Sequence, residues 1–336
     1  MRGKGGWLFI FAAIGLVMAV LGLAFGSVHI PVGEVWEVFF KQVDGPYRVI
    51  VRQVRLPEVL TAAVAGAGLA TAGLLMQTVF HNPLAGPGVL GISGGASVGV
   101  ALAMLAQPLW AASLVPQDLL VAVAALAGAF AVLLLIMVAD RRLGDGITLL
   151  ILGLMVGYLC TAMVSVLQAA SEAKALKGFV LWGLGSFAGM ELSRLPWLAL
   201  PILAGLAGAL GLMKPMNALL IGDEQAGSMG VDVPRVRRRA ICLTGLLAGV
   251  ITAFCGPIAF LGLAVPHVAR AILRTADHRV LLPATMLLGA ALALLADVIV
   301  RTAGGGAALP LNAVTSLMGA PVVLWVLWSG RQWGRR

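Results

Sequence analysis

Few residues of this chain combine the types and spacing that catalysis or metal binding requires. None of the three cysteines forms a CxxC pair, and the four histidines fall in loops or near the ends of apolar runs. The sequence has no GxxxxGK(S/T) loop of an ATPase, no HExxH motif of a zinc hydrolase and no nucleophile elbow. We therefore predict that the chain is not an enzyme, holds no metal ion and binds no cofactor of its own. The residues concerned are Cys160, Cys242, Cys255, His29, His81, His267 and His278.

The pattern with the clearest chemical consequence is a helix break inside an apolar stretch. Asn82-Pro83 and Gly86-Pro87 stop a helix, because proline lacks an amide donor and its predecessor disfavours helical backbone. Broken backbone at membrane depth is tolerated only where protein or a water-filled cavity covers it. We therefore predict that this segment forms part of the wall of a translocation path. The candidate path residues are Gln77, Asn82, Pro83, Gly94 and Gly95.

Composition indicates that lipid is the solvent for most of the chain. Hydrophobic residues make up 60% of the sequence and charged residues 11%, whereas a soluble domain is about 25% charged. A soluble chain this apolar could not cover its core with polar surface. The net charge of +9 comes from short basic clusters between apolar runs, which favours membrane orientation over nucleic-acid binding.

Ten apolar runs predict ten membrane-spanning helices in an all-α integral membrane protein. The third and eighth are short, and the break between the seventh and eighth is placed at Gly256-Pro257 from turn chemistry. Few ionisable groups fall in the middle of these spans, which argues against an ion-coupled carrier or a channel. The predicted spans are residues 7–27, 56–80, 91–107, 118–139, 147–169, 195–213, 238–257, 258–273, 280–300 and 310–329.

The distribution of basic residues predicts the orientation of these spans. An even number of spans places both termini on one side, and cytoplasmic termini put 15 of the 23 Lys and Arg residues inside and 8 outside. We therefore predict a multi-pass protein of the bacterial inner membrane with both termini cytoplasmic. Two outer segments, 32–47 and 170–187, are either interfacial helices or ordered connecting loops.

Small residues predict close contact between helices. Ala62, Gly66 and Ala70 recur every four residues and therefore share one face of the second predicted span. Such a face lets the backbone of another helix approach closely. The pattern indicates a tightly packed bundle and does not identify a substrate.

Several sequence blocks, in a consistent order, resemble the FecCD-type permease family of ABC importers, which includes vitamin B12, iron-siderophore and heme permeases. The resemblance covers residues 52–330, and the first fifty or so residues lack a clear family signal. The blocks are RLPEVL and GAGLATAGLLMQTVFHNPLAGPGVLG within 55–91, ISGGA at 92–96, LWGLGSF at 181–187, LIGDEQAGSMGVDVPR at 220–235, GPIAFLGLAVPHVAR at 256–270, DHRVLLPATMLLGAALALLADVIVR at 277–301 and LPLNAVTSLMGAPVVL at 309–324.

The resemblance implies a fold and a set of partners. The fold would be the type II importer (BtuC-like) permease fold, with ten helices in a single domain over residues 1–336. A second permease, two cytoplasmic ATPase subunits that bind ATP and Mg, and a periplasmic binding protein would complete the importer. ATP binding and hydrolysis would switch the side of the membrane that a central path faces. Whether the two permeases are identical is left open, and a homodimer is the expectation.

The resemblance also assigns a cytoplasmic coupling loop at residues 214–237. Its central part would seat in a groove of the ATPase, and an ordinary solvated loop is the alternative. A short polar helix flanked by glycines suits the end of a rigid lever. The residues assigned to ATPase coupling are Gly222, Asp223, Glu224, Gln225, Ala226 and Gly230.

Arg55 and Arg301 match outward-facing arginines that pair with carboxylates of the binding protein in the family. A guanidinium fork suits carboxylate recognition across an interface, and snorkelling toward lipid headgroups is the alternative. The sequence departs from the family here, because Glu58 stands where a second arginine is common. Arg52, one helical turn before Arg55, is a candidate substitute.

A second departure concerns the start of the last span. Asn312 stands where the family commonly has glycine, and asparagine is the next-best residue at unusual backbone angles. We therefore expect an altered backbone at this position. His267, which follows a proline in the block AVPHVAR, is interpreted as a structural residue rather than a ligand.

The cargo is less constrained than the class of transporter. A ferric siderophore is the first expectation, because such members dominate the family; heme is second and cobalamin third. An ion-coupled secondary transporter or channel for a small solute is the alternative function. A membrane enzyme would require clustered catalytic polar groups, and the sequence shows none.

Overall fold

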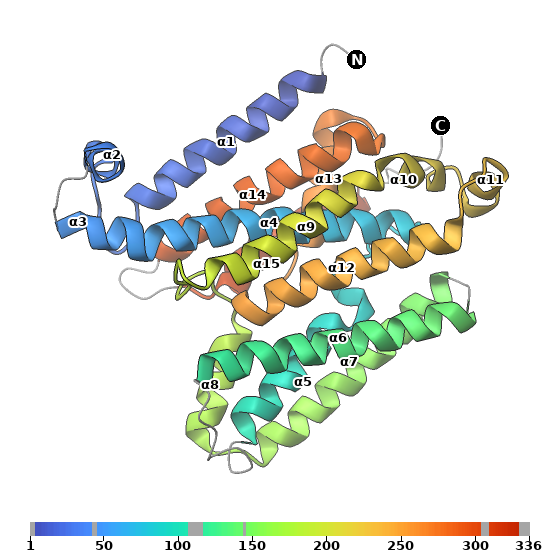
Figure 1. Cartoon of the computed structure of the whole chain (residues 1–336), viewed down its shortest axis with the longest axis horizontal. Coiled ribbons are helices and arrows are strands. Elements are labelled where there is room, and N and C mark those ends of the chain that lie inside the picture. The colour runs from blue at the N-terminus through green and yellow to red at the C-terminus, as the bar shows by residue number, and fades with distance from the viewer. Residues whose placement is uncertain (1–3, 42–45, 107–116, 144–145, 304–308, 329–336) are drawn as a thin grey trace.

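The computed structural model describes residues 4–41, 46–106, 117–143, 146–303 and 309–328, and the regular structure within these ranges is helical (Figure 1). Helices are the expected outcome for apolar runs in lipid, where the backbone must satisfy its hydrogen bonds internally. The long helices lie alongside one another, and both termini lie at the same end of the molecule as α10 and α11 (Figure 1). The predicted all-α architecture is confirmed.

Each of the ten predicted spans coincides with a helix. Three of these helices are short: α5 (Ile92–Leu105), α13 (Leu261–Leu273) and α15 (Leu311–Trp328). α9 (Leu195–Gly211) and α10 (Met213–Leu219) form a pair bent by 56° that is long and apolar enough to span together. Six helices of the described residues meet that test singly: α1 (Lys4–Ala24), α4 (Leu56–Val79), α6 (Gln117–Leu143), α7 (Gly146–Ala169), α12 (Val233–Cys255) and α14 (His278–Thr302).

Shorter helices connect the spans. The outer segments 32–47 and 170–187 each contain one, α2 (Val32–Phe40) and α8 (Ala173–Gly183), which agrees with the helical interpretation of both. α3 (Pro46–Val49) and a π-helical stretch, η1 (Ile50–Arg55), lead directly into α4. The remaining short elements are a 3₁₀ turn, η2 (Pro87–Leu90), before α5 and α11 (Asp223–Ser228) before α12.

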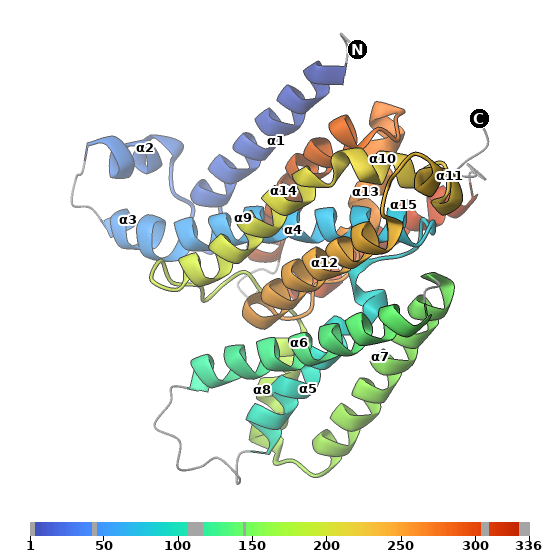
Figure 2. The same ribbon diagram turned by 45° about the vertical axis from the view of Figure 1, so that its right-hand side comes forward.

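α4 lies at the centre of the fold. Its spanning segment is 83% buried, and α9, α12, α13 and α14 pack around it (Figures 1 and 2). α5, α6, α7 and α8 form a second group, which α12 joins to the centre by packing against α5 and α6. α1 packs on α14, on the opposite side of the molecule from α7 (Figure 2).

Glycines permit the closest helix contacts in this core. A methyl group on Gly66 would collide with the carbonyl oxygen of Gly289 in α14, so the predicted small-residue face is confirmed as a contact surface. A methyl group on Gly73 would fall on the carbonyl oxygen of Gly262 in α13. α4 therefore touches α14 and α13 backbone to backbone, as expected of small residues at helix interfaces in membranes.

The predicted break between the seventh and eighth spans lies where turn chemistry placed it. α12 ends at Cys255, and Gly256 has a φ of +72°, a left-handed value that favours glycine. The chain stays non-helical until Phe260, whose φ is +64°, and α13 then begins at Leu261. The break explains why α13 is short, since part of the membrane depth is crossed by non-helical backbone.

Candidate functional site

A short lever between α9 and α12 protrudes at the end of the bundle that carries both termini (Figure 1). It consists of α10 and α11, and α11 begins after Gly222, whose φ is +110°. Gly230, which follows α11, has a φ of +84°. Both values favour glycine, so the two predicted flanking glycines define the ends of a compact helical turn.

α11 is anchored by a partly buried ion pair. Arg237 of α12, which is 8% exposed, donates from Nη2 to Asp223 Oδ2 at 2.8 Å. Its Nη1 lies 4.0 Å from Asp140 Oδ1 of α6. Ala226 adds a fully buried methyl group beneath the helix. Arg237 therefore connects α11 to α12 and, more loosely, to α6.

α10 is anchored to α14 in a similar way. Asn217 Nδ2 donates to Asp277 Oδ1 at 2.6 Å, and the backbone N–H of His278 donates to Asn217 Oδ1 at 2.7 Å. The backbone N–H of Arg279 and the Asn217 amide lower the pKa of Asp277 below its ordinary value. The carboxylate therefore stays ionised at neutral pH and caps α14, so the lever is held to three different spans.

The outer surface of the lever mixes polar and apolar side chains. Glu224 and Gln225 are exposed, as predicted. Ile221 and Met229 are also exposed, by 57% and 65%. Exposed apolar residues beside polar ones are typical of a protein contact surface. Ile221 and Met229 were not among the residues predicted to contact a partner, although apolar residues within a polar loop could have indicated them.

The predicted docking arginines lie at the opposite end of the spans and make contacts inside the chain. Arg55 is 3% exposed, and it donates to the backbone carbonyls of Leu23, at 2.7 Å, and of Val28. Arg52 Nη2 donates to the Val38 carbonyl at 2.9 Å. These bonds fasten η1 to the segment that follows α1 and to α2.

Arg301 joins three helices in one buried cluster. Its Nη1 lies 3.5 Å from Glu58 Oε2 of α4 and donates to the Gly22 carbonyl of α1 at 3.0 Å. Its Nη2 donates to Asp297, one turn earlier in α14. The Glu58 side chain is 7% exposed and that of Asp297 is 3% exposed. The departure at Glu58 therefore supplies an internal partner for Arg301.

The predicted path residues are spread over several contacts. Gln77 is fully buried, donating to the Leu263 carbonyl at 3.2 Å and accepting from Arg270 at 2.7 Å. Gly95 is buried against α6, and Gly94 packs against Cys160 of α7. In this conformation Gln77 and Gly95 hold helices together and border no open space, so a path role for them stays a prediction.

The predicted helix break after α4 is confirmed, and side-chain hydrogen bonds hold its turn in place. Asn82 Oδ1 accepts from the Leu84 backbone N–H at 2.9 Å, which closes a tight turn. The Pro83 carbonyl accepts from His267 Nε2 of α13 at 2.8 Å. His267 is 3% exposed, and this contact supports the structural interpretation of its ring.

Asn312 does not have the unusual backbone that the sequence led us to expect. It lies in α15 with an ordinary helical conformation. Its Nδ2 donates to the carbonyls of Pro257, at 2.7 Å, and Gly183, at 3.1 Å, and its Oδ1 accepts from the Ala259 N–H at 2.9 Å. The side chain therefore joins α15 to the end of α8 and to the break after α12, a role that glycine could not perform.

α7 and α15 carry broad apolar surfaces with no partner within the described residues of the chain. Only 22% of the spanning segment of α7 is buried. Such faces require lipid or a second protein, since apolar surface is stable only out of water. Strongly exposed apolar side chains of the two helices are Tyr158, Leu159, Val166, Leu317, Leu324 and Trp328.

The described residues contain no group of three His, Cys, Asp or Glu side chains placed to hold a metal ion. The main features of this structure are the lever of α10 and α11 at one end, the buried ionic cluster around Arg301 at the other end, and the helix breaks after α4 and α12. A model of the FecCD transport family matches residues 14–329. This chain belongs to the FecCD transport family. The match begins well before residue 52, where the recognisable blocks start.

Members of the FecCD family that resemble this chain are permeases. It is 35% identical to the vitamin B12 import system permease protein BtuC of Klebsiella pneumoniae, over 97% of this chain and 94% of the relative. It is 36% identical to that of Shigella boydii, over 97% and 96%. A solved structure described as an inward-facing metal-chelate type ABC transporter matches with a TM-score of 0.85 and 30% identity, covering 96% of this chain and 98% of that one.

Membership of the FecCD family fixes the class of this chain. It is a multi-pass permease subunit of the inner membrane with the fold of an ABC importer, and it is not an enzyme. In such a FecCD permease, ATP hydrolysis is the task of separate subunits. The permease itself must supply a path, a means of closing it and a rigid connection to the ATPase.

Proposed function

We propose that two copies of this chain form the membrane-spanning unit of an ATP-driven importer for a metal chelate. Two ATPase subunits, which bind ATP and Mg, would seat against α11, and a periplasmic binding protein would deliver the cargo at the opposite end. The observation that carries the proposal is the anchored lever. Its exposed face offers Glu224, Gln225, Ile221 and Met229 to a partner, while Asp223 ties it to α12 and α6 through Arg237.

The proposed orientation places α11 and both termini in the cytoplasm. The ends of α6 and α9 and the start of α12 meet at the α11 end (Figure 1), and basic residues cluster there. Arg141, Arg142, Arg235, Arg238 and Arg239 all belong to these segments. The positive-inside rule therefore supports this end as the inner one.

The proposed partner of the apolar faces of α7 and α15 is a second copy of the chain. The path would then lie between the two copies, which explains why a single chain buries Gln77 and Gly95. A central path between subunits needs no metal site of its own, because the chelate carries its metal with it. Alternating access would follow from ATP-driven movement of the two levers.

The proposed cargo is cobalamin, ahead of a ferric siderophore and heme. Permeases named for vitamin B12 import align with this chain over nearly its whole length at 35–36% identity, and this evidence outweighs the frequency argument that favoured siderophores. The three cargoes share a bulky organic shell around a metal ion. They can therefore be compared in one assay.

Reconstitution tests the proposal. The chain, its ATPase and its binding protein are placed in liposomes with ATP enclosed on the ATPase side, and uptake of cyanocobalamin, a ferric siderophore and heme is compared. We expect accumulation that requires both the ATPase and ATP, with cobalamin favoured. Accumulation driven by a proton or sodium gradient without the ATPase would show a secondary carrier instead. ATP-dependent uptake of another chelate would overturn only the choice of cargo.

The outer end around Arg52, Arg55 and Arg301 is the proposed docking face for the binding protein. The guanidinium groups of all three are engaged within the chain. We therefore propose that they contribute by holding α1, α2, α4 and α14 in the arrangement that the binding protein recognises. Affinity of the binding protein for variants at these positions, measured beside their stability, separates this role from direct contact.

A further inference from the structure

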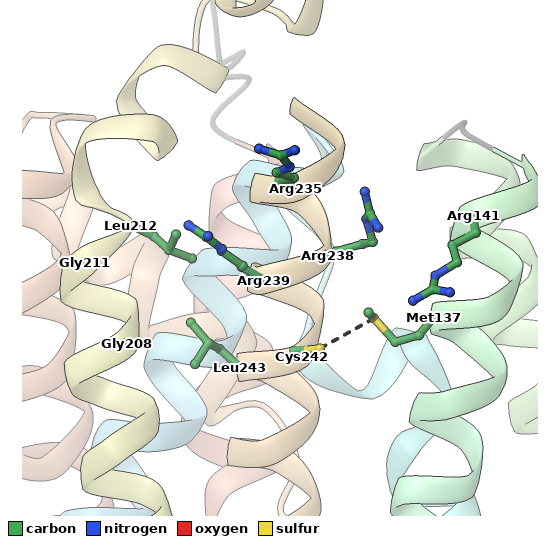
Figure 3. Close-up of a pocket in the computed structure, with 10 residues that line it drawn as sticks. All are labelled: Met137, Arg141, Gly208, Gly211, Leu212, Arg235, Arg238, Arg239, Cys242 and Leu243. Carbon is green, nitrogen blue, oxygen red and sulfur yellow. Dashed lines mark hydrogen bonds between the residues drawn. The ribbon is translucent and has the colours of Figure 1, made fainter. Parts of the chain in front are cut away.

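A groove of about 560 Å³ opens at the lever end of the bundle along α12, with α9 on one side of α12 and α6 on the other (Figure 3). Its rim is basic and its walls are small or apolar. Its lining residues are Met137, Arg141, Gly208, Gly211, Leu212, Arg235, Arg238, Arg239, Cys242 and Leu243.

The positive charge of the groove follows from helix geometry. Arg238 and Arg239 lie three and four residues after Arg235, so each projects from α12 near Arg235. Arg237 lies on a different face and turns to Asp223. Arg141 of α6 reaches across from the facing wall toward α12 (Figure 3). Arg141 and Arg238 thus lie on the α6 side of α12, whereas Arg239 points toward α9 (Figure 3).

Acidic residues neutralise only part of this charge. Asp232 pairs with Arg235, with Oδ2 2.9 Å from Nε, and Asp140 lies 4.0 Å from Arg237 and also attracts Arg238 from a longer distance. Among the described residues, no carboxylate lies within 4.0 Å of the guanidinium groups of Arg141, Arg238 or Arg239. The groove therefore holds excess positive charge that an anion can neutralise.

The lower part of the groove is apolar. Gly211 leaves open space along α9 because it has no side chain, whereas Leu243 of α12 packs against Gly208. Cys242 and Met137 close the gap between α12 and α6, with their sulfur atoms 3.6 Å apart (Figure 3). A ligand that fits this groove needs an anionic head at the rim and a hydrocarbon portion below it.

We propose that this groove binds an anionic phospholipid, with its phosphate between Arg141 of α6 and Arg238 of α12 and an acyl chain over the apolar surface between α12 and α9. Guanidinium groups form strong, paired hydrogen bonds with phosphate oxygens. Basic pockets between spanning helices at the cytoplasmic surface suit lipid headgroups of this charge. Its placement in the inner leaflet rests on the proposed orientation, whereas binding itself does not.

The site couples the lipid to the lever through α12. Arg238 and Arg239 lie one and two residues after Arg237, which holds α11 through Asp223. A phosphate that bridges α6 and α12 would fix the distance between these helices at the lever end. Bound lipid is therefore expected to stabilise one separation of α6 and α12.

Native mass spectrometry of the full-length protein in mild detergent tests the proposal. Phosphatidylglycerol is titrated against phosphatidylcholine of the same acyl composition, and the Arg141→Gln/Arg238→Gln double variant is compared with the parent. Arg142→Gln is the matched control, because Arg142 is exposed beside Arg141 but does not line the groove. We expect preferential phosphatidylglycerol binding, weakened about 25-fold in the double variant and little in the control, from about a fivefold effect per basic residue.

Four outcomes would overturn the proposal. Equal phosphatidylglycerol binding by parent and double variant would exclude the groove, and an equal loss in Arg142→Gln would show general surface attraction. Full competition by inorganic phosphate would show a site for the free anion. Unchanged lipid binding with weakened ATPase binding in the double variant would show that the groove receives an acidic surface of the ATPase. Thermal unfolding of all variants confirms that each is folded.

Discussion

Replacing Arg301 with glutamine distinguishes two roles for this residue: an internal clamp that pairs with Glu58, and a contact with the binding protein. Arg301 Nη1 lies 3.5 Å from Glu58 Oε2, and two unit charges at that separation attract by about 5 kcal/mol at an effective dielectric constant of about 20. Desolvation offsets part of this attraction, but removing one partner of a buried pair costs about 3–5 kcal/mol, because the other charge stays buried. We expect Arg301→Gln to lower the free energy of unfolding by about that amount.

Thermal unfolding in detergent, followed by tryptophan fluorescence, measures this effect. At roughly 2 °C per kcal/mol for a chain of this size, the midpoint is expected to fall by about 6–10 °C. Arg301→Lys retains the charge without the fork and should fall between parent and glutamine variant. Glu58→Gln/Arg301→Gln should unfold at a higher temperature than Arg301→Gln, because the second change removes the unpaired carboxylate.

The affinity of the binding protein for each variant is the second measurement, because a docking role and a clamp role predict different results. If Arg301→Gln keeps the midpoint of the parent but loses affinity for the binding protein, Arg301 is a docking residue and the clamp is refuted. A double variant no more stable than Arg301→Gln would likewise refute the pairing with Glu58. Loss of both stability and affinity, with both partly restored in the double variant, is the result that the clamp predicts.

Two further predictions follow from the packing and from the lever. Gly73→Ala is expected to lower the free energy of unfolding by more than about 2 kcal/mol, because its methyl group would meet the Gly262 carbonyl and push α4 away from α13. Gly6→Ala, which has open space around it, is the control. Equal unfolding temperatures for the two variants would contradict the contact between α4 and α13. Glu224→Lys is expected to keep the free energy of unfolding of the parent while reducing the amount of cargo transported per ATP hydrolysed. Asp223→Asn is expected to lower the free energy of unfolding by about 1 kcal/mol. This value is small for an ion pair with a buried arginine because the Asp223 carboxylate is 39% exposed. Reconstituted transport and ATPase rates, with melting curves, distinguish the two, and unchanged coupling in Glu224→Lys would remove the lever role from that residue.

Apolar runs and helix-breaking residues predict most of this fold. The ten spans and the break at Gly256 follow from local composition, because lipid enforces helical hydrogen bonding wherever the chain is apolar. The two outer segments contain helices, one of the two alternatives that the sequence left open. The short spans are predicted as well, since their length is read from the same runs. Local sequence cannot say which helix packs on which, and the resemblance supplies that order.

Long-range polar contacts are the part that the sequence could not predict. Glu58 lies more than two hundred residues from Arg301 along the chain, so its pairing has no local signal and its departure from the family was interpreted as a weaker docking contact. Asn312 was interpreted through backbone geometry, although its amide bonds to segments near residues 183 and 257–259. In both cases the side chain bonds to a group that is distant in the sequence and becomes a neighbour only when the chain folds.

The buried ionic cluster also has an electrical consequence. Arg55 also lies near enough to Glu58 and Arg301 to interact electrostatically with them. With all four groups ionised, the formal charges of Arg55, Glu58, Asp297 and Arg301 sum to zero. A membrane potential does about 2.3 kcal/mol of work on each elementary charge per 100 mV, so a neutral cluster that shifts as a unit experiences no net force from it. The outer ends of α4 and α14 can therefore move during transport without sensing the voltage across the membrane. An arginine in place of Glu58 would give the cluster a charge of +2 and would make the same movement voltage-dependent.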